Sequence, residues 1–213
     1  MNKRLIVGII LFGSLWGFSE VIIGSTIADA GVPSGGIMTG FFAIPFLVFS
    51  RLMYRKPGMQ LGMGLVAGSL RIFNPFIGCH VCSAIAIMAE GALFELIFYK
   101  ISFDFRELKS LTTQASIGIV TSYTIFIGGY IVTQILTPIV AGSGFYLENL
   151  IFFMPRILSA GILPALIASI TVPLIISAKK LDISIKDKLY YPTALSVSAL
   201  CWILVISSWL LFA

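Results

Sequence analysis

The amino-acid sequence predicts an all-α fold: a polytopic transmembrane helix bundle of six or seven helices, with kinked or broken helices. Three observations carry this prediction. Of the 213 residues, 58% are hydrophobic and only 11% charged; the mean hydropathy is +1.04; and the basic residues gather between long apolar segments. Soluble domains carry about 25% charged residues, so this chain could not cover a water-exposed surface. We therefore expect one transmembrane domain over residues 1–213, without a separate soluble catalytic domain.

The apolar segments define the expected helices in chain order. The first, Leu5–Ile27, is about 35 Å long as a helix, whereas the core of a cleaved signal peptide is about half that length. We therefore expect it to be retained as the first span. The third segment is short, and if it forms one broken unit with the fourth around Asn74-Pro75, the chain has six spans rather than seven. The expected spans are residues 5–27, 36–53, 59–73, 81–99, 112–140, 150–178 and 191–212.

Two of the later segments contain residues that disturb helices. Proline removes a backbone donor and kinks a helix, and irregular helices commonly line cavities in transporters. The sixth segment is expected to be kinked or split because it carries Pro155, Pro164 and Pro173. The fifth is expected to bend, either at Gly128-Gly129 or at Pro138.

The basic residues predict the orientation in the membrane. Cytoplasmic loops are enriched in Lys and Arg. With the N-terminus inside, every Lys and Arg except Arg71 and Arg156 falls on the inner side. The formal charge of +5 is therefore interpreted as topogenic and not as a nucleic-acid-binding surface. We expect a multi-pass protein of a prokaryotic plasma membrane, in contact with lipid and with a cytoplasmic N-terminus.

Charged residues inside apolar segments mark the candidate site, because they are costly in a membrane unless they face a cavity, a partner or a ligand. Glu20 shares a helix face with Gly13, Gly17 and Gly24. Such a glycine stripe packs against other helices and not against lipid. Arg71 follows Gly64 and Gly68 in the same way. A Glu20–Arg71 pair is thus expected near the outer surface, serving either as a structural contact or as part of a ligand pocket.

The fourth segment carries two further carboxylates, Glu90 and Glu95. They lie about 140° apart around a helix, so they cannot both face one small ligand. We assign Glu90 to the candidate site and Glu95 to a helix contact or a partner-facing role, with a proton relay through both and Glu20 left open. Near the outer end of the sixth segment, Arg156 is expected to supply a second cation to the cavity.

The motif Cys79-His80-Val-Cys82 allows three interpretations. Thiolate and imidazole are ligands suited to zinc, copper or nickel, which makes Cys79, His80 and Cys82 a candidate transition-metal site. A Cys-x-x-Cys pair can instead form a disulfide or a redox centre. Buried, inert thiols are the third interpretation.

The N-terminal half has an outline similar to a known family. Leu15-Trp16-Gly17 and Glu20 lie in the first segment, Pro33-Ser-Gly-Gly36 opens the second, and Asn74-Pro75 and the stretch 83–91 follow a glycine-rich third. Over roughly residues 5–100 the chain resembles the substrate-capture (S) components of energy-coupling factor transporters.

The resemblance implies a compact bundle, typically of six helices, that binds a vitamin or a metal near its outer face. It implies partners as well: a transmembrane coupling protein and a pair of ATPases. The sequence itself has no phosphate-binding Gly-Lys-Ser/Thr motif. Docking in that family uses small residues on the first helix, often spaced Ala-x-x-x-Ala, a spacing that Gly13 and Gly17 match. The metal-specific relatives begin Met-His, whereas this chain begins Met-Asn.

The leading hypothesis is a non-enzymatic, substrate-binding membrane component for uptake of a small solute, such as a zwitterionic vitamin or precursor, energised by partner proteins. Three alternatives stay open: transition-metal capture through the Cys-His cluster, a membrane thiol oxidoreductase, and a structural membrane protein without a ligand. No cofactor is expected other than a metal at that cluster. The predicted substrate-binding residues are Glu20, Arg71, Asn74, His80, Glu90 and Arg156.

Overall fold

A computed structural model of the chain describes residues 3–74, 79–99, 104–140, 142, 147–179 and 187–212. All regular structure in these residues is helical, which confirms the predicted all-α bundle. Within the same residues, six helical segments are long and apolar enough to cross a membrane. They are Lys3–Asp29, Ser34–Tyr54, His80–Phe98, Leu111–Val140, Leu147–Ala178 and Leu189–Leu211.

The first two spans are each interrupted by one π-helical turn. In the first span, α1 (Lys3–Phe18) and α2 (Gly24–Asp29) flank the π-turn η1 (Ser19–Ile23). In the second, α3 (Ser34–Met38) and α4 (Ile44–Tyr54) flank the π-turn η2 (Thr39–Ala43). Such turns occur frequently at functional sites because they re-aim the side chains that follow.

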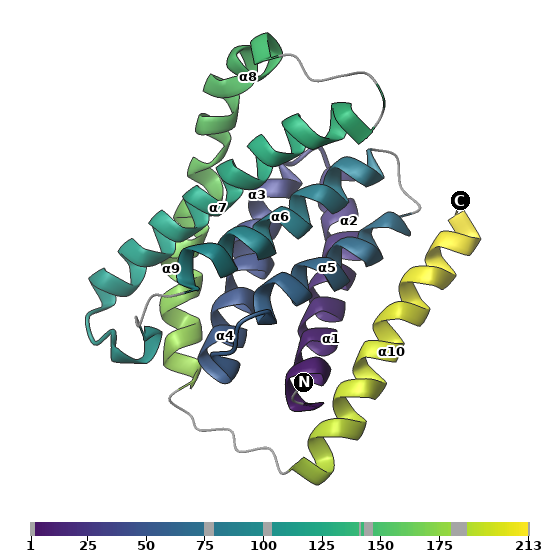
Figure 1. Ribbon diagram of the computed structural model, residues 1–213, viewed down its shortest axis with the longest axis vertical. Helices are drawn as coiled ribbons and strands as arrows, with labels where there is room; N and C mark the ends of the chain where they lie inside the picture. The colour runs from purple at the N-terminus through teal and green to yellow at the C-terminus, as the bar shows by residue number, and fades with distance from the viewer. Residues whose placement is uncertain are drawn as a thin grey trace.

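The third predicted segment is the short helix α5 (Met59–Ile72), which lies beside α6 (His80–Phe98), with α7 (Leu111–Val140) on the other side of α6 (Figure 1). Glycines let α5 and α6 touch through their backbones. A methyl group at Gly91 would come within 2.9 Å of the Gly64 Cα and 2.7 Å of the Gln60 carbonyl oxygen. The described residues therefore show α5 and α6 as separate neighbouring helices; residues 75–78, where the predicted Asn74-Pro75 break falls, are outside the described chain.

Glu95 fixes the start of α5. Its carboxylate accepts backbone N–H bonds from Gly58, from Gln60 at 3.0 Å and from Leu61 at 3.1 Å. The first N–H groups of a helix have no intrahelical partner, and a carboxylate there also complements the helix dipole. The predicted role of Glu95 as a helix contact thus matches its place in the structure, where its side chain is buried.

The sixth predicted segment is split into α8 (Leu147–Ala160) and α9 (Ile162–Lys179), as its prolines suggested. The break lies at Gly161, between the first two prolines, and α9 then packs along α7 and the second span. By contrast α7 runs as one 30-residue helix through Gly128-Gly129, with Pro138 in its last turn.

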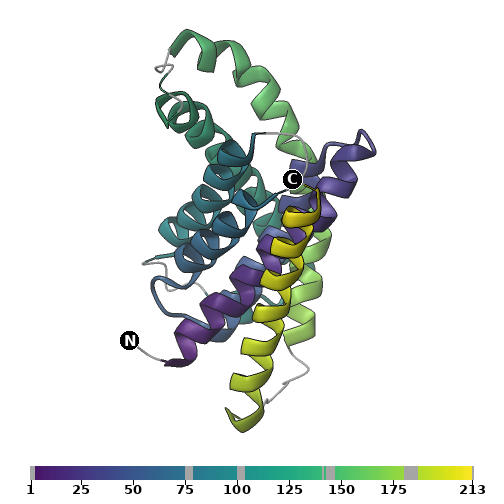
Figure 2. The ribbon, with the colours of Figure 1, turned by 90° about the vertical axis from the view of Figure 1, so that its right-hand side faces the viewer.

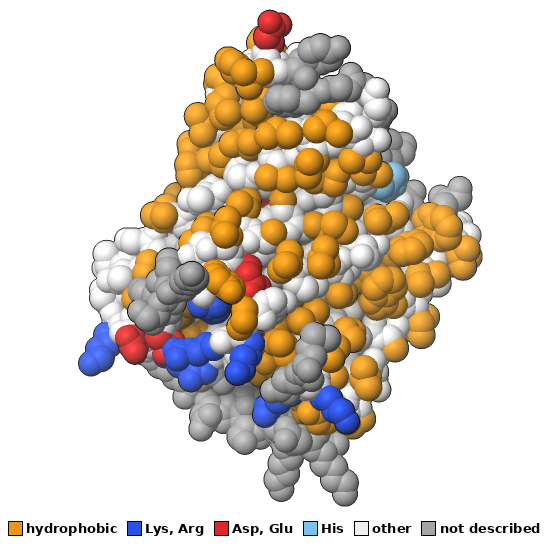
Figure 3. Space-filling model, in the orientation of Figure 1, with side chains coloured by type: hydrophobic (Ala, Val, Ile, Leu, Met, Phe, Trp, Pro, Cys, Tyr) orange, Lys and Arg blue, Asp and Glu red, His pale blue; other side chains and the backbone are white. Residues whose placement is uncertain are grey.

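The last helix, α10 (Asp187–Phe212), lies at the edge of the bundle, where α1 is its main neighbour (Figures 1 and 2). A bond from Trp202 Nε1 to Ser14 Oγ (3.1 Å) ties the two helices together. Apolar side chains cover most of the face shown in Figure 3, and Lys and Arg side chains gather at its lower end. Arg55, directly after α4, forms an ion pair with Asp104 beside the 3₁₀ turn η3 (Phe105–Glu107).

Candidate functional site

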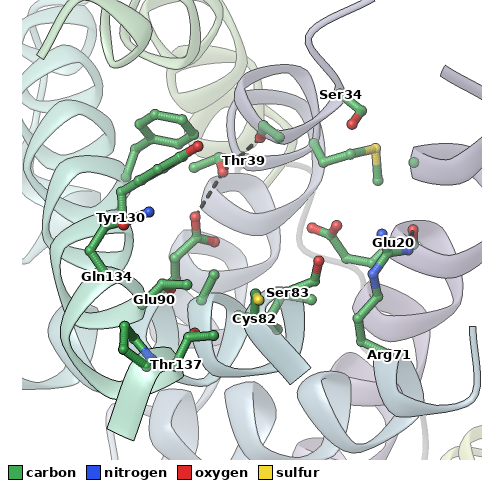
Figure 4. A pocket seen from close by; sticks show the side chains of 18 residues that line it. Glu20, Ser34, Thr39, Arg71, Cys82, Ser83, Glu90, Tyr130, Gln134 and Thr137 are labelled. Atoms are coloured by element: carbon green, nitrogen blue, oxygen red, sulfur yellow. Dashed lines mark hydrogen bonds between the residues drawn. The ribbon is translucent and has the colours of Figure 1, made fainter. Parts of the chain in front are cut away.

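A cavity of about 460 Å³ lies between the first two spans and the helices α5, α6 and α7. Figure 4 shows its polar side chains converging from these elements. Its volume is in the range of sites that hold metabolite-sized ligands. Its polar and charged lining residues are Glu20, Ser34, Thr39, Arg71, Cys82, Ser83, Glu90, Tyr130, Thr133, Gln134 and Thr137.

Glu20 reaches the cavity from the π-turn η1. The indole Nε1 of Trp16, one helical turn earlier and fully buried, donates to Glu20 Oε1 at 3.2 Å. This bond holds one carboxylate oxygen toward α1. Glu20 faces the bundle interior, as the glycine stripe indicated. It lies in the π-turn, the part of the first span that lines the cavity.

Arg71 enters the cavity from the last turn of α5. Its Nη1 donates to the backbone carbonyl of Glu20 at 2.6 Å and to Ser25 Oγ at 3.3 Å. Ser25 in turn donates to Asn74 Oδ1 at 3.2 Å. The structure thus brings Glu20 and Arg71 together as predicted, but the hydrogen bond goes to the main chain of Glu20. Asn74, predicted as a binding residue, is buried outside the cavity lining and holds Ser25 in place for Arg71.

Glu90 lies on α6, across the cavity from Glu20 (Figure 4). Only 6% of its surface is exposed, and its Oε1 lies 2.8 Å from the hydroxyl of Thr39 in the π-turn η2. The same hydroxyl lies 3.0 Å from the carbonyl oxygen of Gly35. On the other side, α7 passes close to the stem of Glu90 because Gly129 has no side chain: a methyl group there would lie 3.2 Å from Glu90 Cγ.

The cavity wall on α7 is a polar stripe, and its residues Thr133, Gln134 and Thr137 were not predicted from the sequence. Tyr130, Thr133, Gln134 and Thr137 all line the cavity. Their spacing of three, one and three residues puts them on one face of the C-terminal half of α7, where the other residues from position 125 to 140 are apolar or glycine. That stripe of polar residues in a membrane span was the available signal. Thr39 was missed too, and its pairing with Glu90 required knowing which helices are neighbours.

Two predicted residues lie elsewhere. His80 begins α6 and is not part of the cavity lining; its Nδ1 is buried and has no hydrogen-bond partner among the described residues. Arg156 is exposed on α8 and lines a second, larger cavity of about 810 Å³. The two cavities share lining residues, including Tyr130 and Gln134, so the second forms a vestibule beside the first. Arg156 therefore serves the vestibule and not the inner cavity.

Cys79 and Cys82 form a disulfide across the first turn of α6. Cys82 lines the cavity, and Cys79 Sγ accepts the backbone N–H of Cys82 at 3.1 Å as the helix cap. With both sulfurs joined, neither is a thiolate ligand. The described residues contain no group of three or more His, Cys, Asp or Glu side chains placed to hold a metal ion. Of the three interpretations of the motif, the structure agrees with the disulfide.

The expectation that Gly13 and Gly17 dock a partner protein needs correction. Both glycines are buried in the contact between α1 and α5. Methyl groups there would meet Val66 Cβ at 2.6 Å and Leu70 Cβ at 2.8 Å, respectively. This glycine stripe therefore packs against α5 of the same chain and is not available to a partner protein. That agrees with its position on the same helix face as Glu20.

The cavity can accommodate a small polar solute with at least one charged group. Two carboxylates and one guanidinium provide ionic contacts, and hydroxyl and amide groups on η2, α6 and α7 provide hydrogen bonds. Comparison with known proteins found nothing similar to this chain: no protein-family model, no curated protein and no solved structure matches it.

Proposed function

We propose that this integral membrane protein is the substrate-binding component of a small-solute uptake system. The observation that carries the proposal is the cavity with both signs of charge inside a bundle of membrane-spanning length. Charged side chains within membrane spans are costly, and in transport proteins they mark the path or the binding site of a solute.

The position of the cavity along the bundle supports uptake from outside. On the first span, Arg4 is at the start and Glu20 is in the far half; on α5, Arg71 is in the last turn. The basic residues Arg51, Arg55 and Arg106 lie at the opposite end, with the ends of α4 and η3. With that basic end in the cytoplasm, as the positive-inside rule favours, the cavity occupies the outer half.

The charges favour a zwitterionic solute of vitamin or precursor size. The carboxylates of Glu20 and Glu90 suit a cationic group, and Arg71, with a buried Nε that has no partner among the described residues, suits an anionic one. Because the sequence has no phosphate-binding loop, we propose that a transmembrane coupling protein and ATPase subunits supply the energy.

The test is to identify what the protein carries when purified from its host membrane. Solute released from wild-type protein by denaturation is measured by mass spectrometry and compared with Glu20→Gln and Arg71→Ala. The matched control is Glu148→Gln, which removes an exposed carboxylate on α8. We expect one solute at near-stoichiometric level in wild type and control, and its loss from both cavity variants with folding intact. Equal amounts in all four proteins, or none in wild type, would contradict the proposal.

A second candidate function is thiol–disulfide exchange, which is favoured by one observation: the Cys79–Cys82 disulfide at the helix terminus beside the cavity. A helix N-terminus stabilises a thiolate, and Cys-x-x-Cys pairs at such sites are often redox-active. This function requires the pair to cycle. Thiol labelling in intact membranes, before and after addition of dithiothreitol, decides it: a bond that never opens excludes the enzyme.

A further inference from the structure

The hydroxyl of Thr39 makes two contacts that one hydrogen cannot serve alone. It lies 3.0 Å from the Gly35 carbonyl oxygen and 2.8 Å from Glu90 Oε1, the two dashed lines in Figure 4. A hydroxyl donates one hydrogen, and a backbone carbonyl can only accept. Both contacts are satisfied together when Thr39 donates to Gly35 and the carboxyl group of Glu90 donates to Thr39. A protonated Glu90 satisfies both contacts at once, whereas a carboxylate would take the Thr39 hydrogen and leave the Gly35 carbonyl oxygen with the backbone N–H of Thr39.

We infer that Glu90 holds a proton and exchanges it for the ammonium group of a cationic or zwitterionic amine when the amine binds. This inference rests on the proposed function and names its substrate class and the proton that binding releases. The O–H bond of Glu90 breaks, the proton leaves to bulk water, and the carboxylate pairs with the incoming ammonium group. For a cationic amine, one positive charge leaves as one arrives, so the buried charge of the cavity stays constant. A zwitterionic amine brings one negative charge in addition, and Arg71 is the lining residue that would pair with it.

The groups around Glu90 fit a cation at this position. Among titratable and charged side chains, Glu20 faces it from η1, Tyr130 from α7 and Arg71 from α5. The Arg71 guanidinium is bonded on the far side of the cavity, to the Glu20 carbonyl and Ser25, so it does not neutralise Glu90. On its own helix, His80 is not among the residues that line the cavity.

A cation would therefore be stabilised most strongly in the space between the carboxylates of Glu20 and Glu90. The second oxygen of Glu90, Oε2, has no hydrogen-bond donor among the described residues, and Figure 4 shows it turned toward Glu20. The aromatic rings of Phe126 and Tyr130, with centroids 5.8 Å apart, line the same space. Aromatic faces attract ammonium groups, and Arg71 remains for an anionic end of the same solute.

The protonation state is tested without any ligand. Infrared spectra of the purified protein at neutral pH show whether a protonated carboxyl band is present, and Glu90→Gln assigns it. We expect the band in wild type, its loss in Glu90→Gln, and a change in its frequency in Thr39→Val that Thr39→Ser, which keeps the hydroxyl, does not show. Identical spectra for wild type and Glu90→Gln overturn the inference.

The substrate class is tested with three probes of one shape: benzylammonium, benzyl alcohol and benzoate. We expect thermal stabilisation by benzylammonium above the other two, with release of one proton per molecule bound in weakly buffered detergent solution. In Glu90→Gln we expect binding at least about tenfold weaker, the equivalent of about 1.4 kcal/mol, and no proton release. Absence of an ammonium preference, or binding without proton release, overturns the exchange. The solute that co-purifies with the protein tests the proposed function separately.

Discussion

Replacement of Glu95 is the sharpest test of which carboxylates build the fold and which serve the cavity. In Glu95→Ala, the backbone N–H groups of Gly58, Gln60 and Leu61 lose their acceptor at once. A hydrogen bond to a charged acceptor contributes about 1.5–3 kcal/mol when buried, and capping bonds near a helix end contribute about 1 kcal/mol. Lys56, just before this end, is charged and exposed, so we expect water to reach part of it. We therefore take the lower value for each bond and expect a loss of about 3 kcal/mol.

The assay is reversible unfolding in detergent micelles, followed by the fluorescence of the buried Trp16. Glu95→Gln keeps one acceptor oxygen and is expected to lose about half as much stability as the alanine variant. Glu107→Ala, which removes an exposed carboxylate near the same end, is the control and should change stability by less than about 0.5 kcal/mol. If Glu95→Ala unfolds like the control, the helix-capping role is wrong.

Three other expectations follow from the packing. Gly91→Ala should destabilise by about 1–3 kcal/mol in the same unfolding assay, because the new methyl group meets the α5 backbone, whereas Gly35→Ala, with 3.9 Å of clearance, should be neutral. Trp202→Phe should cost about 1 kcal/mol through the lost bond to Ser14 and should leave binding of the co-purified solute unchanged. Cys82→Ser should free Cys79 for maleimide labelling from the outside; no labelling would contradict its exposed position at the start of α6.

The helices were predictable from the sequence because membrane spans are set by local composition. So was the inward direction of Glu20 and Arg71, since a glycine stripe shows which face packs against other helices. The pairing of Glu90 with Thr39 was not, because these residues are 51 positions apart and the contact depends on which helices are neighbours. The π-turns that carry Glu20 and Thr39 follow from packing between helices, which no local pattern of residues specifies.

The position of Arg156 also could not be predicted from the sequence, because it depends on how the helices pack. As part of one continuous sixth span, it would have been near the outer end of the cavity, as predicted. The helix is interrupted at Gly161, and α8, which precedes this residue, places Arg156 in the vestibule. The prolines signalled a break, but the direction that the chain takes beyond it depends on packing between α8 and its neighbours. The stripe of Gly13 and Gly17 likewise shows a close contact, and only the assembled bundle shows that the contact is with α5.

The short helix α5 also has a consequence for the lipid around the protein. Its 14 residues rise about 21 Å, whereas the hydrocarbon layer of a bilayer is about 30 Å thick. Leu61, Leu65 and Ile72 are exposed on its surface, so we expect lipid to contact this helix directly. A helix shorter than the hydrocarbon layer is expected to be accommodated by local thinning of the bilayer beside it. The membrane is therefore expected to be thinnest next to Arg71, which would shorten the path of the proposed charged solute through a low-dielectric medium.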